Sequence, residues 1–447
     1  MNRIINSGLV LWVLLLCWGS SLKSSSILYA KAITLEQFIT AVRENNLDLA
    51  LAEQELAMAG AIKKEAWSTA FPKFTAEGSY NRNLLDNYMF VEMPDFETGE
   101  VSVQKFKFSF KNEYAFNAVM SQTLFSFRVN NALKAASEYG KMTDFIYNAT
   151  QQGVISTSKK LFYQTLLLKE VLRIQSEAET NARENYEQLK KKYDQGVVSE
   201  LQLLQAEVRW RNQIPEQTAA RRNCELALNQ IKYLSGVSID SSLDITGDLE
   251  QFPILPQPIQ IAQVLQQRPD YNAVLWEERL RLTGVKAQKA DYFPSLNGTF
   301  VYLFNAVSDQ FQLDNRNENY RVGLTLSIPI WLGGYTGAQA QKARIDLEKN
   351  RIRKEQMSET IQADLKNIYV RLQEAHERIN AAQNTQKAAE KGFRIAQISA
   401  DNGLITQFEL NETRLYFDQA QLNYYAAIYD YLAAWFDWEY TVGQVKE

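Results

Sequence analysis

The only histidine in the chain is the first residue to test for catalytic or metal chemistry. His376 lies between Glu374 and Glu377 in a segment with a helical pattern. A zinc site on a helix needs a second histidine nearby, and a catalytic triad needs a nucleophile held against the imidazole. The sequence offers neither. We interpret His376 as a solvated helix residue, and we expect no enzyme activity, no metal site and no cofactor.

A glycine-rich segment is the second candidate, for phosphate binding. It contains Gly333, Gly334 and Gly337. A phosphate loop would continue with Gly-Lys-Ser or Gly-Lys-Thr, which does not follow here. We expect these glycines to turn a strand into a helix instead. The net charge of -4 gives no concentrated basic surface, so we also expect no nucleic-acid partner.

The first residues have the pattern of a secretory signal peptide. Arg3 supplies a positive start, residues 9–18 form an apolar run, and Ala30-Lys31-Ala32 fits a cleavage site. The apolar run is too short for a membrane-spanning helix. We therefore assign residues 1–32 to a signal peptide. A permanent N-terminal anchor and lipid attachment at Cys17 are the alternatives.

The composition of the whole chain predicts long, ordered elements. Of the 447 residues, 46% are hydrophobic and 22% are charged, which is not the balance of a disordered protein. The chain contains only 9 prolines and 19 glycines. Because these residues punctuate turns, we expect few turns and long uninterrupted segments.

Two short segments carry the same turn signals, and the rest of the chain is organised around them. Each ends one helical pattern and begins another. Gly196 and Gly403 can take the left-handed conformation that ends a helix, and Ser199 and Thr406 can cap the helix that follows. We expect both segments to be tips of helical hairpins.

The two tips belong to a tandem duplication. An offset of 207 positions relates them, and it also relates Gly236 to Gly443. Residues 44–72 map onto residues 266–294 at an offset of 222. We divide the chain into a first repeat (33–236), a linker (237–258), a second repeat (259–443) and a short tail (444–447).

Each repeat contains one very long helical pattern without proline, at residues 133–193 and 336–400. At about 1.5 Å per residue, the first would be roughly 90 Å long. Its apolar residues recur at the intervals of a coiled coil. Shorter helices are expected at residues 34–68, 200–235 and 409–440. Pro215 should break or bend its helix, because it lacks a backbone N–H and clashes with the previous turn.

Each repeat also contains two segments in which apolar and polar residues alternate as in β-strands. The expected strands are residues 73–81, 114–125, 296–305 and 320–331. Four such strands cannot close a barrel. Since exposed strand edges cannot exist in lipid, several copies must combine if these strands meet a membrane. The first pair has a connection 15 residues longer than the second, and we place this insertion in a surface loop within residues 83–112.

The order of these elements resembles that of the outer membrane efflux protein family. In each repeat a helix, Phe-Pro, a strand pair, a very long helix, a Gly-x-x-Ser/Thr tip and a return helix follow one another, and the resemblance covers nearly all of the mature chain. It implies a mainly α-helical fold with membrane β-hairpins, in which coiled-coil helices form a trimeric α-barrel. It also implies that each protomer gives four strands to a 12-stranded β-barrel in the outer membrane.

The resemblance also implies roles for the tips. In the family, the hairpin tips close the periplasmic end of the tunnel and meet a periplasmic adaptor protein, which places Gly196, Ser199, Gly403 and Thr406 at that contact. An acidic constriction just inside the second tip falls on Glu409 and Glu412. The family's best-known channel has aspartates there, so the charge is kept on longer side chains. The alternative is that both are ordinary first-turn acids favoured by the helix dipole.

The resemblance predicts an outer membrane channel of a Gram-negative bacterium, with helices that extend into the periplasm. It would belong to a tripartite efflux or type I secretion system, with a homotrimer, an adaptor, an inner-membrane pump and membrane lipid as partners. A periplasmic coiled-coil adaptor or structural protein is the first alternative, but it leaves the alternating strands unexplained. A secreted hydrolase is the second, and it lacks a nucleophile and base. The sequence does not identify the exported substrate.

Overall fold

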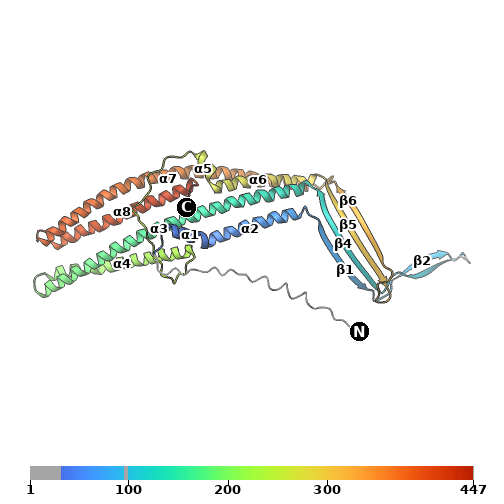
Figure 1. Ribbon diagram of the computed structural model, residues 1–447, viewed down its shortest axis with the longest axis horizontal. Coiled ribbons are helices and arrows are strands. Elements are labelled where there is room, and N and C mark those ends of the chain that lie inside the picture. The colour runs from blue at the N-terminus through green and yellow to red at the C-terminus, as the bar shows by residue number, and fades with distance from the viewer. Residues whose placement is uncertain (1–31, 95–98, 446–447) are drawn as a thin grey trace, which may run out of the picture.

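The computed structural model describes residues 32–94 and 99–445. The chain folds into a long rod, with helices along most of its length and a small β-sheet near one end (Figure 1). The expected signal peptide, residues 1–32, lies outside the described residues except for its last position.

Two antiparallel helical hairpins make up most of the rod. Each pairs a very long helix with a return helix of about half its length, so one side of each long helix is left for a second, shorter helix. The pairs are α3 (Phe127–Asp194) with α4 (Glu200–Ser235), and α7 (Tyr335–Asp401) with α8 (Gln407–Thr441). The four helices expected from the sequence are confirmed, although α3 begins at Phe127 rather than at residue 133.

The single helix expected at residues 34–68 was wrong, because the chain forms two helices there. These are α1 (Leu35–Asn45) and α2 (Leu47–Ser68). Asn46 between them has extended backbone angles, and its side chain accepts hydrogen bonds from the N–H groups of Asp48 and Leu49 at 3.0 and 3.2 Å. Asparagine is a weak residue inside a helix and a strong N-cap. It therefore ends one helix and starts the next.

The second repeat breaks at the equivalent position. Arg268, 222 positions after Asn46, separates α5 (Ile261–Gln267) from α6 (Pro269–Lys289). Here the break follows from Pro269, which cannot continue a helix but fits its first turn. The 3₁₀ turn η1 (Ala290–Tyr292) then leads from α6 towards the sheet.

A glycine packs against each break. A Cβ atom on Gly236 would lie 2.6 Å from the Cβ of Asn45, and one on Gly443 would lie 2.9 Å from the carbonyl carbon of Gln267. Both glycines also have positive φ angles, of 69° and 73°. In both repeats a glycine therefore permits the close approach to the break. The breaks are 222 positions apart and the two glycines are 207 positions apart.

Of the break or bend expected at Pro215, the break does not occur. Helix α4 continues through this residue from Glu200 to Ser235. Pro215 is exposed, so water can solvate the carbonyl group one turn earlier that loses its N–H partner. A proline on the wet side of a helix costs less than the rule for helix interiors suggests.

The four expected strands are confirmed and form one antiparallel sheet in the order β1-β4-β5-β6. The strands are β1 (Lys73–Arg82), β4 (Asn112–Phe125), β5 (Ser295–Ser308) and β6 (Asn317–Ser327). The last strand ends at Ser327 rather than at residue 331. Pro329 cannot donate to a ladder, and Gly333 and Gly334, with positive φ angles, then turn the chain into α7.

The 15-residue insertion expected as a surface loop instead forms a two-stranded ribbon. Strands β2 (Tyr88–Pro94) and β3 (Val101–Lys107) pair beyond the end of the main sheet (Figure 1). At its base, Lys107 Nζ lies 3.1 Å from Asp309 and 3.3 Å from Asp86. The pair with Asp309 connects the ribbon to the turn between β5 and β6.

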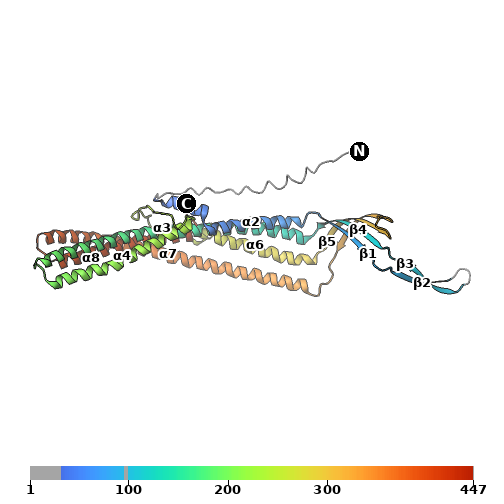
Figure 2. The same ribbon diagram turned by 90° about the horizontal axis from the view of Figure 1, so that it is seen from below.

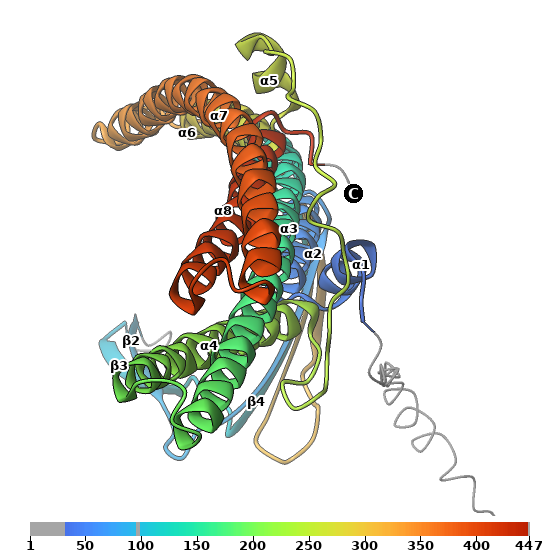
Figure 3. The ribbon, with the colours of Figure 1, turned by 90° about the vertical axis from the view of Figure 1, so that its left-hand side faces the viewer.

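A view along the rod shows that the helices form a curved layer (Figure 3). Helices α1 and α5 and the chain between α4 and α5 lie on its convex side, and β2 and β3 lie on the opposite side. We call α1, α5 and residues 237–260 the collar. Figure 2 shows the collar at mid-length, between the helical tips and the sheet.

The main hydrophobic core lies where the collar meets α3 and α8. Phe38 of α1 stacks on Phe162 of α3 with ring centroids 5.9 Å apart, and Ile245 of the expected linker is buried. Residues 237–258 are therefore packed against the helices along part of their length. Tyr431 is fully buried, donates a hydrogen bond to the carbonyl oxygen of Pro253, and has a pKa raised to about 12 by burial.

Candidate functional site

One face of the main sheet is apolar and the other is polar. The strand register places side chains of one character in rows that cross all four strands. An apolar row contains Phe74, Met120, Phe300 and Val322. The adjacent row, on the other face, contains Lys73, Ser121, Thr299 and Gly323. The apolar face is bare in the protomer, since Phe74 is 73% and Val322 is 79% exposed. Such a face suits contact with lipid.

Aromatic side chains gather at both ends of the strands. At one end Tyr80 lies 5.1 Å from Tyr114 between ring centroids, and at the other Phe127 lies 5.1 Å from Phe125 and 4.9 Å from Phe293. At about 3.3 Å per residue the path from Tyr114 to Phe125 is about 36 Å. With a strand tilt of about 40° this becomes about 28 Å, close to the apolar band of a membrane barrel with aromatic girdles.

Both edges of the main sheet lack a partner strand in the described part of the chain. Strands β1 and β6 each pair on one side only, and every residue of β1 is exposed. Unpaired backbone groups cannot lie in lipid. The protomer alone therefore does not contain a complete membrane structure.

The first helical tip joins α3 to α4 with a standard helix end and helix start. Gly196 has a φ angle of 74° and its N–H donates to the carbonyl oxygen of Tyr193 at 2.8 Å. Ser199 caps α4 in a capping box with Gln202, in which each side chain accepts from the other residue's backbone N–H. The tip carries no carboxylate in this box.

The second tip has the same backbone and a different charge. Gly403 has a φ angle of 71°, and Thr406 caps α8 in a capping box whose third-position residue is Glu409. The Glu409 carboxylate accepts hydrogen bonds from the Thr406 N–H at 2.7 Å and from its hydroxyl at 2.9 Å. Glu412, one turn later, accepts a hydrogen bond from the Tyr416 hydroxyl at 2.8 Å.

The capping contacts keep Glu409 charged. The hydrogen bond from the Thr406 backbone, followed by that from its hydroxyl, lowers the carboxyl pKa below its ordinary value. The hydrogen bond to Glu412 raises the pKa of Tyr416. Both carboxylates are exposed near the end of the rod. Glu409 thus combines the capping role expected of a first-turn acid with a persistent negative charge.

Matching aromatic pairs hold each hairpin together. In the first, Tyr186 stacks on Trp210 at 5.3 Å, and in the second, Phe393 stacks on Phe417 at 5.7 Å. The second pair lies 207 positions after the first in both members. The parts of the two hairpins near the tips are therefore packed in the same way.

One hydrogen bond connects the two hairpins near the tips. Arg209 of α4 donates from Nη2 to the backbone oxygen of Asn411 in α8 at 2.9 Å. Arg209 is half-buried, and burial lowers its pKa, while burial raises the pKa of the nearby Asp418. Nothing in the local sequence distinguishes Arg209 from the other arginines, so sequence reasoning missed this contact.

A groove of about 470 Å³ runs between the hairpins beside this hydrogen bond. It brings together residues of α3, α4 and the second tip, including Leu189, Gln202, Arg209, Thr406 and Phe408. Of the tip residues singled out from the sequence, Thr406 lines this groove, whereas Gly196 and Gly403 lie at the ends of their hairpins with open space around them. Phe408 is 71% exposed and offers an apolar contact at the groove's edge.

His376 is not the solvated residue that its neighbours suggested. It is half-buried, its ring centroid lies 5.7 Å from that of Tyr431, and its buried Nδ1 has no hydrogen-bond partner in the structure. Within residues 32–94 and 99–445, no three metal-ligating side chains come together in one group. No helix in this same part of the chain has the length and apolar character to span a membrane.

The chain is similar in sequence to known outer membrane proteins. A family model described as "Outer membrane efflux protein" matches residues 38–237 and 260–437, well over half of the chain. The alkaline protease secretion protein AprF of Pseudomonas aeruginosa is 20% identical over 346 residues, which cover 75% of this chain and 71% of AprF. The outer membrane protein TolC of Salmonella enteritidis is 20% identical over 358 residues, covering 75% and 70%.

Solved structures share the fold. The CmeC outer membrane channel of Campylobacter jejuni superimposes with a TM-score of 0.76 at 20% identity, over 92% of this chain and 86% of CmeC. The MtrE outer membrane channel of Neisseria gonorrhoeae gives 0.74 at 16% identity, over 92% and 89%. Both matches include the sheet and the helical hairpins, since they span nearly the whole chain.

Proposed function

Because the chain belongs to the outer membrane efflux protein family and is an outer membrane channel for efflux or secretion, we propose that three copies build its pore. The observation that carries this proposal is the four-stranded sheet with one bare apolar face and two unpaired edges. Joining β6 of one protomer to β1 of the next pairs every edge. Three copies then give a closed barrel of 12 strands, which removes all unpaired backbone groups from lipid.

The curved helical layer extends this barrel into the periplasm. In the proposed trimer the concave side of this layer faces the axis, and the collar, which lies on the convex side (Figure 3), faces outwards. The helices of three protomers then form a tunnel about as long as α3, or roughly 100 Å. Energy for transport comes from an inner-membrane pump, since the family consists of channel proteins rather than enzymes.

The two tips form the contact with a periplasmic adaptor. The groove between the hairpins, with exposed Phe408 at its edge, offers an apolar and polar surface to a helical hairpin of the adaptor. Gly196, Ser199, Gly403 and Thr406 shape this surface by fixing both turns. Helix-in-groove docking of this kind uses side chains spaced along one helix face.

Glu409 and Glu412 form the constriction. A trimer sets six of these carboxylates around one axis, where they attract cations and repel one another. The lowered pKa of Glu409 supports a charge that persists at neutral and mildly acidic pH. The hydrogen bond between Arg209 and Asn411 opposes the repulsion by holding the hairpins of one protomer together.

The decisive experiment is extraction followed by conductance. We expect the protein to require detergent, to run as a heat-modifiable trimer, and to form cation-selective channels in planar bilayers. Recovery in the soluble periplasmic fraction would favour the coiled-coil adaptor instead. A second experiment supplies a type I secretion pump and a small-solute efflux pump in turn. Export of a protein, as the name of AprF suggests for that relative, would favour type I secretion over small-solute efflux.

A further inference from the structure

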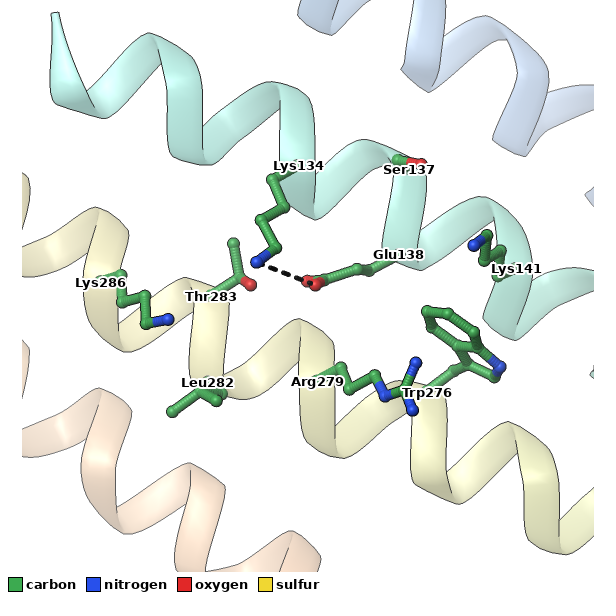
Figure 4. Close-up of a pocket in the computed structure, with 9 residues that line it drawn as sticks. All are labelled: Lys134, Ser137, Glu138, Lys141, Trp276, Arg279, Leu282, Thr283 and Lys286. Carbon is green, nitrogen blue, oxygen red and sulfur yellow. Dashed lines mark ion pairs between the residues drawn. The ribbon is translucent and has the colours of Figure 1, made fainter.

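A basic pocket lies on the rod between the sheet and the collar, away from the tips. It is a cavity of about 390 Å³ between α3 and α6 (Figure 4). Four cationic side chains line it, and only one carboxylate does. The cationic residues are Lys134, Lys141, Arg279 and Lys286. The pocket therefore carries a net charge of about three positive units, one for each cation beyond the single carboxylate.

The carboxylate is buried and only partly satisfied. Glu138 is 8% exposed, and its Oε1 lies 4.0 Å from Nζ of Lys134. Its Oε2 is buried without a hydrogen-bond partner in the structure. Figure 4 shows the carboxylate between the two helices, turned towards α6. A buried carboxylate oxygen without a donor is costly. Lys134 pairs with Oε1, so it is Oε2 that remains open to a further donor.

Two of the cations are held away from this oxygen. Lys141 Nζ lies 4.5 Å and the Arg279 guanidinium carbon 4.2 Å from the ring centre of Trp276. These cation–π contacts keep them at the end of the pocket that is farther from the sheet. Lys134 and Lys286 line the end nearer to the sheet. Going from the sheet towards the collar, Lys134 and Lys286 therefore come first and the carboxylate of Glu138 comes next.

The pocket opens on the outer side of the tunnel wall. Phe162, Leu166 and Lys169 of α3 pack on the collar, through Phe38, Gly247 and Asp244 respectively. Lys134, Glu138 and Lys141 precede these three residues by 28 positions each, which is four heptads. Residues a whole number of heptads apart face the same side of a coiled-coil helix. The pocket therefore faces outwards, as the collar does.

The distance to the membrane suits a lipid headgroup. Phe127 and Phe293 mark the periplasmic aromatic girdle of the sheet, and Lys134 and Lys286 each lie seven residues away along their helices. This is about 10 Å at 1.5 Å per residue. The headgroup layer itself extends about 5 to 7 Å from the hydrocarbon, and the flexible lysine stems can reach towards it.

We propose that this pocket binds the headgroup of a zwitterionic phospholipid of the phosphatidylethanolamine type, from the periplasmic leaflet of the outer membrane. Lys134 and Lys286 contact the phosphate, and the ammonium group donates to Oε2 of Glu138. The order of the groups in the pocket matches that of the lipid, whose phosphate lies nearer to the acyl chains than its ammonium group. The inference rests on the placement of the sheet in the outer membrane.

Lipid retention by the purified trimer tests the proposal. The protein is placed in nanodiscs of phosphatidylethanolamine and phosphatidylglycerol in equal parts, released into detergent, and examined by native mass spectrometry. We expect phosphatidylethanolamine to be retained preferentially. Glu138→Gln keeps the shape of the side chain and should lower this preference about tenfold, the factor for one charge-assisted hydrogen bond. Asp144→Asn, an exposed change on the same helix, should leave it unaltered.

Three outcomes would overturn the proposal: an unchanged preference in Glu138→Gln, equal retention of both lipids by the wild type, and displacement of the lipid by free glycerophosphoethanolamine at low concentration. The last would assign the pocket to a soluble ligand. If Glu138→Gln does not assemble, Lys134→Gln with Lys286→Gln must lower retention of both lipids for the proposal to stand. Trimer formation and conductance of each variant are measured separately. They test the proposed channel independently of lipid binding.

Discussion

The two helical tips have the same backbone and different charges. Both end the long helix with a glycine at positive φ and begin the return helix with a capping box, and both hairpins contain a stacked aromatic pair at equivalent positions. The third residue of the return helix is Gln202 in the first tip and Glu409 in the second, and one turn later Gln205 corresponds to Glu412. Duplication preserved the fold of the tip. Divergence placed carboxylates at positions 409 and 412 of the second return helix, where the first has glutamines, whereas the first return helix instead begins with Glu200.

The turn and the charge of each tip are separate properties. Glutamine and glutamate both complete the capping box, since each offers a side-chain oxygen to the N-cap backbone N–H. The charge is therefore not required for the turn. Exchanging these residues between the tips should move the electrostatic property without changing the structure.

The largest effect is expected when the second tip is given the side chains of the first. Glu409→Gln with Glu412→Gln should remove most of the cation selectivity of single channels, because six carboxylates are lost from each trimer. Reversal potentials in a salt gradient measure this change. Gln202→Glu with Gln205→Glu is the matched exchange in the first tip and should increase selectivity. Unchanged selectivity in both variants would place the constriction elsewhere.

A smaller effect is expected when the contact between the hairpins is removed. Arg209→Ala eliminates the hydrogen bond to the Asn411 carbonyl oxygen, so the repulsion among the carboxylates should separate the hairpins more often. We expect a severalfold higher open probability in planar bilayers. Arg211→Ala is the control, because Arg211 pairs with Glu207 on its own helix. Equal behaviour of the two variants would show that Arg209 does not restrain the tips.

A smaller difference between the tips is expected in the pH dependence of cation selectivity, because Glu409 in the second capping box titrates and Gln202 in the first does not. The folded-state pKa of Glu409 is lowered, so its charge and the cap it stabilises are complete above the unfolded value and are lost only as the pH falls through the folded value. In a Glu412→Gln background, cation selectivity should persist below about pH 4.5.

Thr406→Ala tests the cause of this shift. It removes the hydroxyl donor to Glu409, so the pKa should rise and selectivity should disappear at a higher pH. Reversal potentials measured from about pH 6 to about pH 3.5 provide the comparison. If the Glu412→Gln channel lost its cation selectivity at the same pH with and without Thr406→Ala, the hydroxyl contact would not be what lowers the pKa of Glu409.

The smallest effect is expected from the caps themselves. Ser199→Ala and Thr406→Ala should each destabilise the first turn of its return helix by about 1 kcal/mol. Hydrogen exchange near each tip, at neutral pH, measures this local opening. Because the backbones are alike, the two values should agree closely. A much larger effect at one tip would show that the neighbouring hairpin relies on that cap.

The sequence predicted the elements with the strongest periodicity. The two long helices, the return helices and the four strands were all anticipated, since each expected element carries nine or more residues of consistent pattern. The exceptions have local causes. Asn46 ends a helix by capping the next, and Pro215 remains within a helix because its freed carbonyl group meets water. Both outcomes depend on neighbours that periodicity does not describe.

Contacts between distant segments could not be predicted in this way. The hydrogen bond from Arg209 to Asn411 joins residues about two hundred positions apart. The ion pair from Lys107 to Asp309 joins the base of the ribbon to the opposite repeat. The sequence singled out Glu409 and Glu412 as the proposed constriction by their position relative to Gly403. Their capping and tyrosine contacts became visible only in three dimensions.

In the proposed tunnel, the collar lies where each long helix could pivot. From Phe162, where α3 packs on the collar, to Gly196 at the tip, the helix runs about 50 Å without interruption. A rigid arm of this length converts a rotation of about 5° at the collar into a displacement of about 4 Å at the tip. Small changes in side-chain packing at mid-length can therefore be amplified into a change of aperture, and the helices themselves need not unfold or bend.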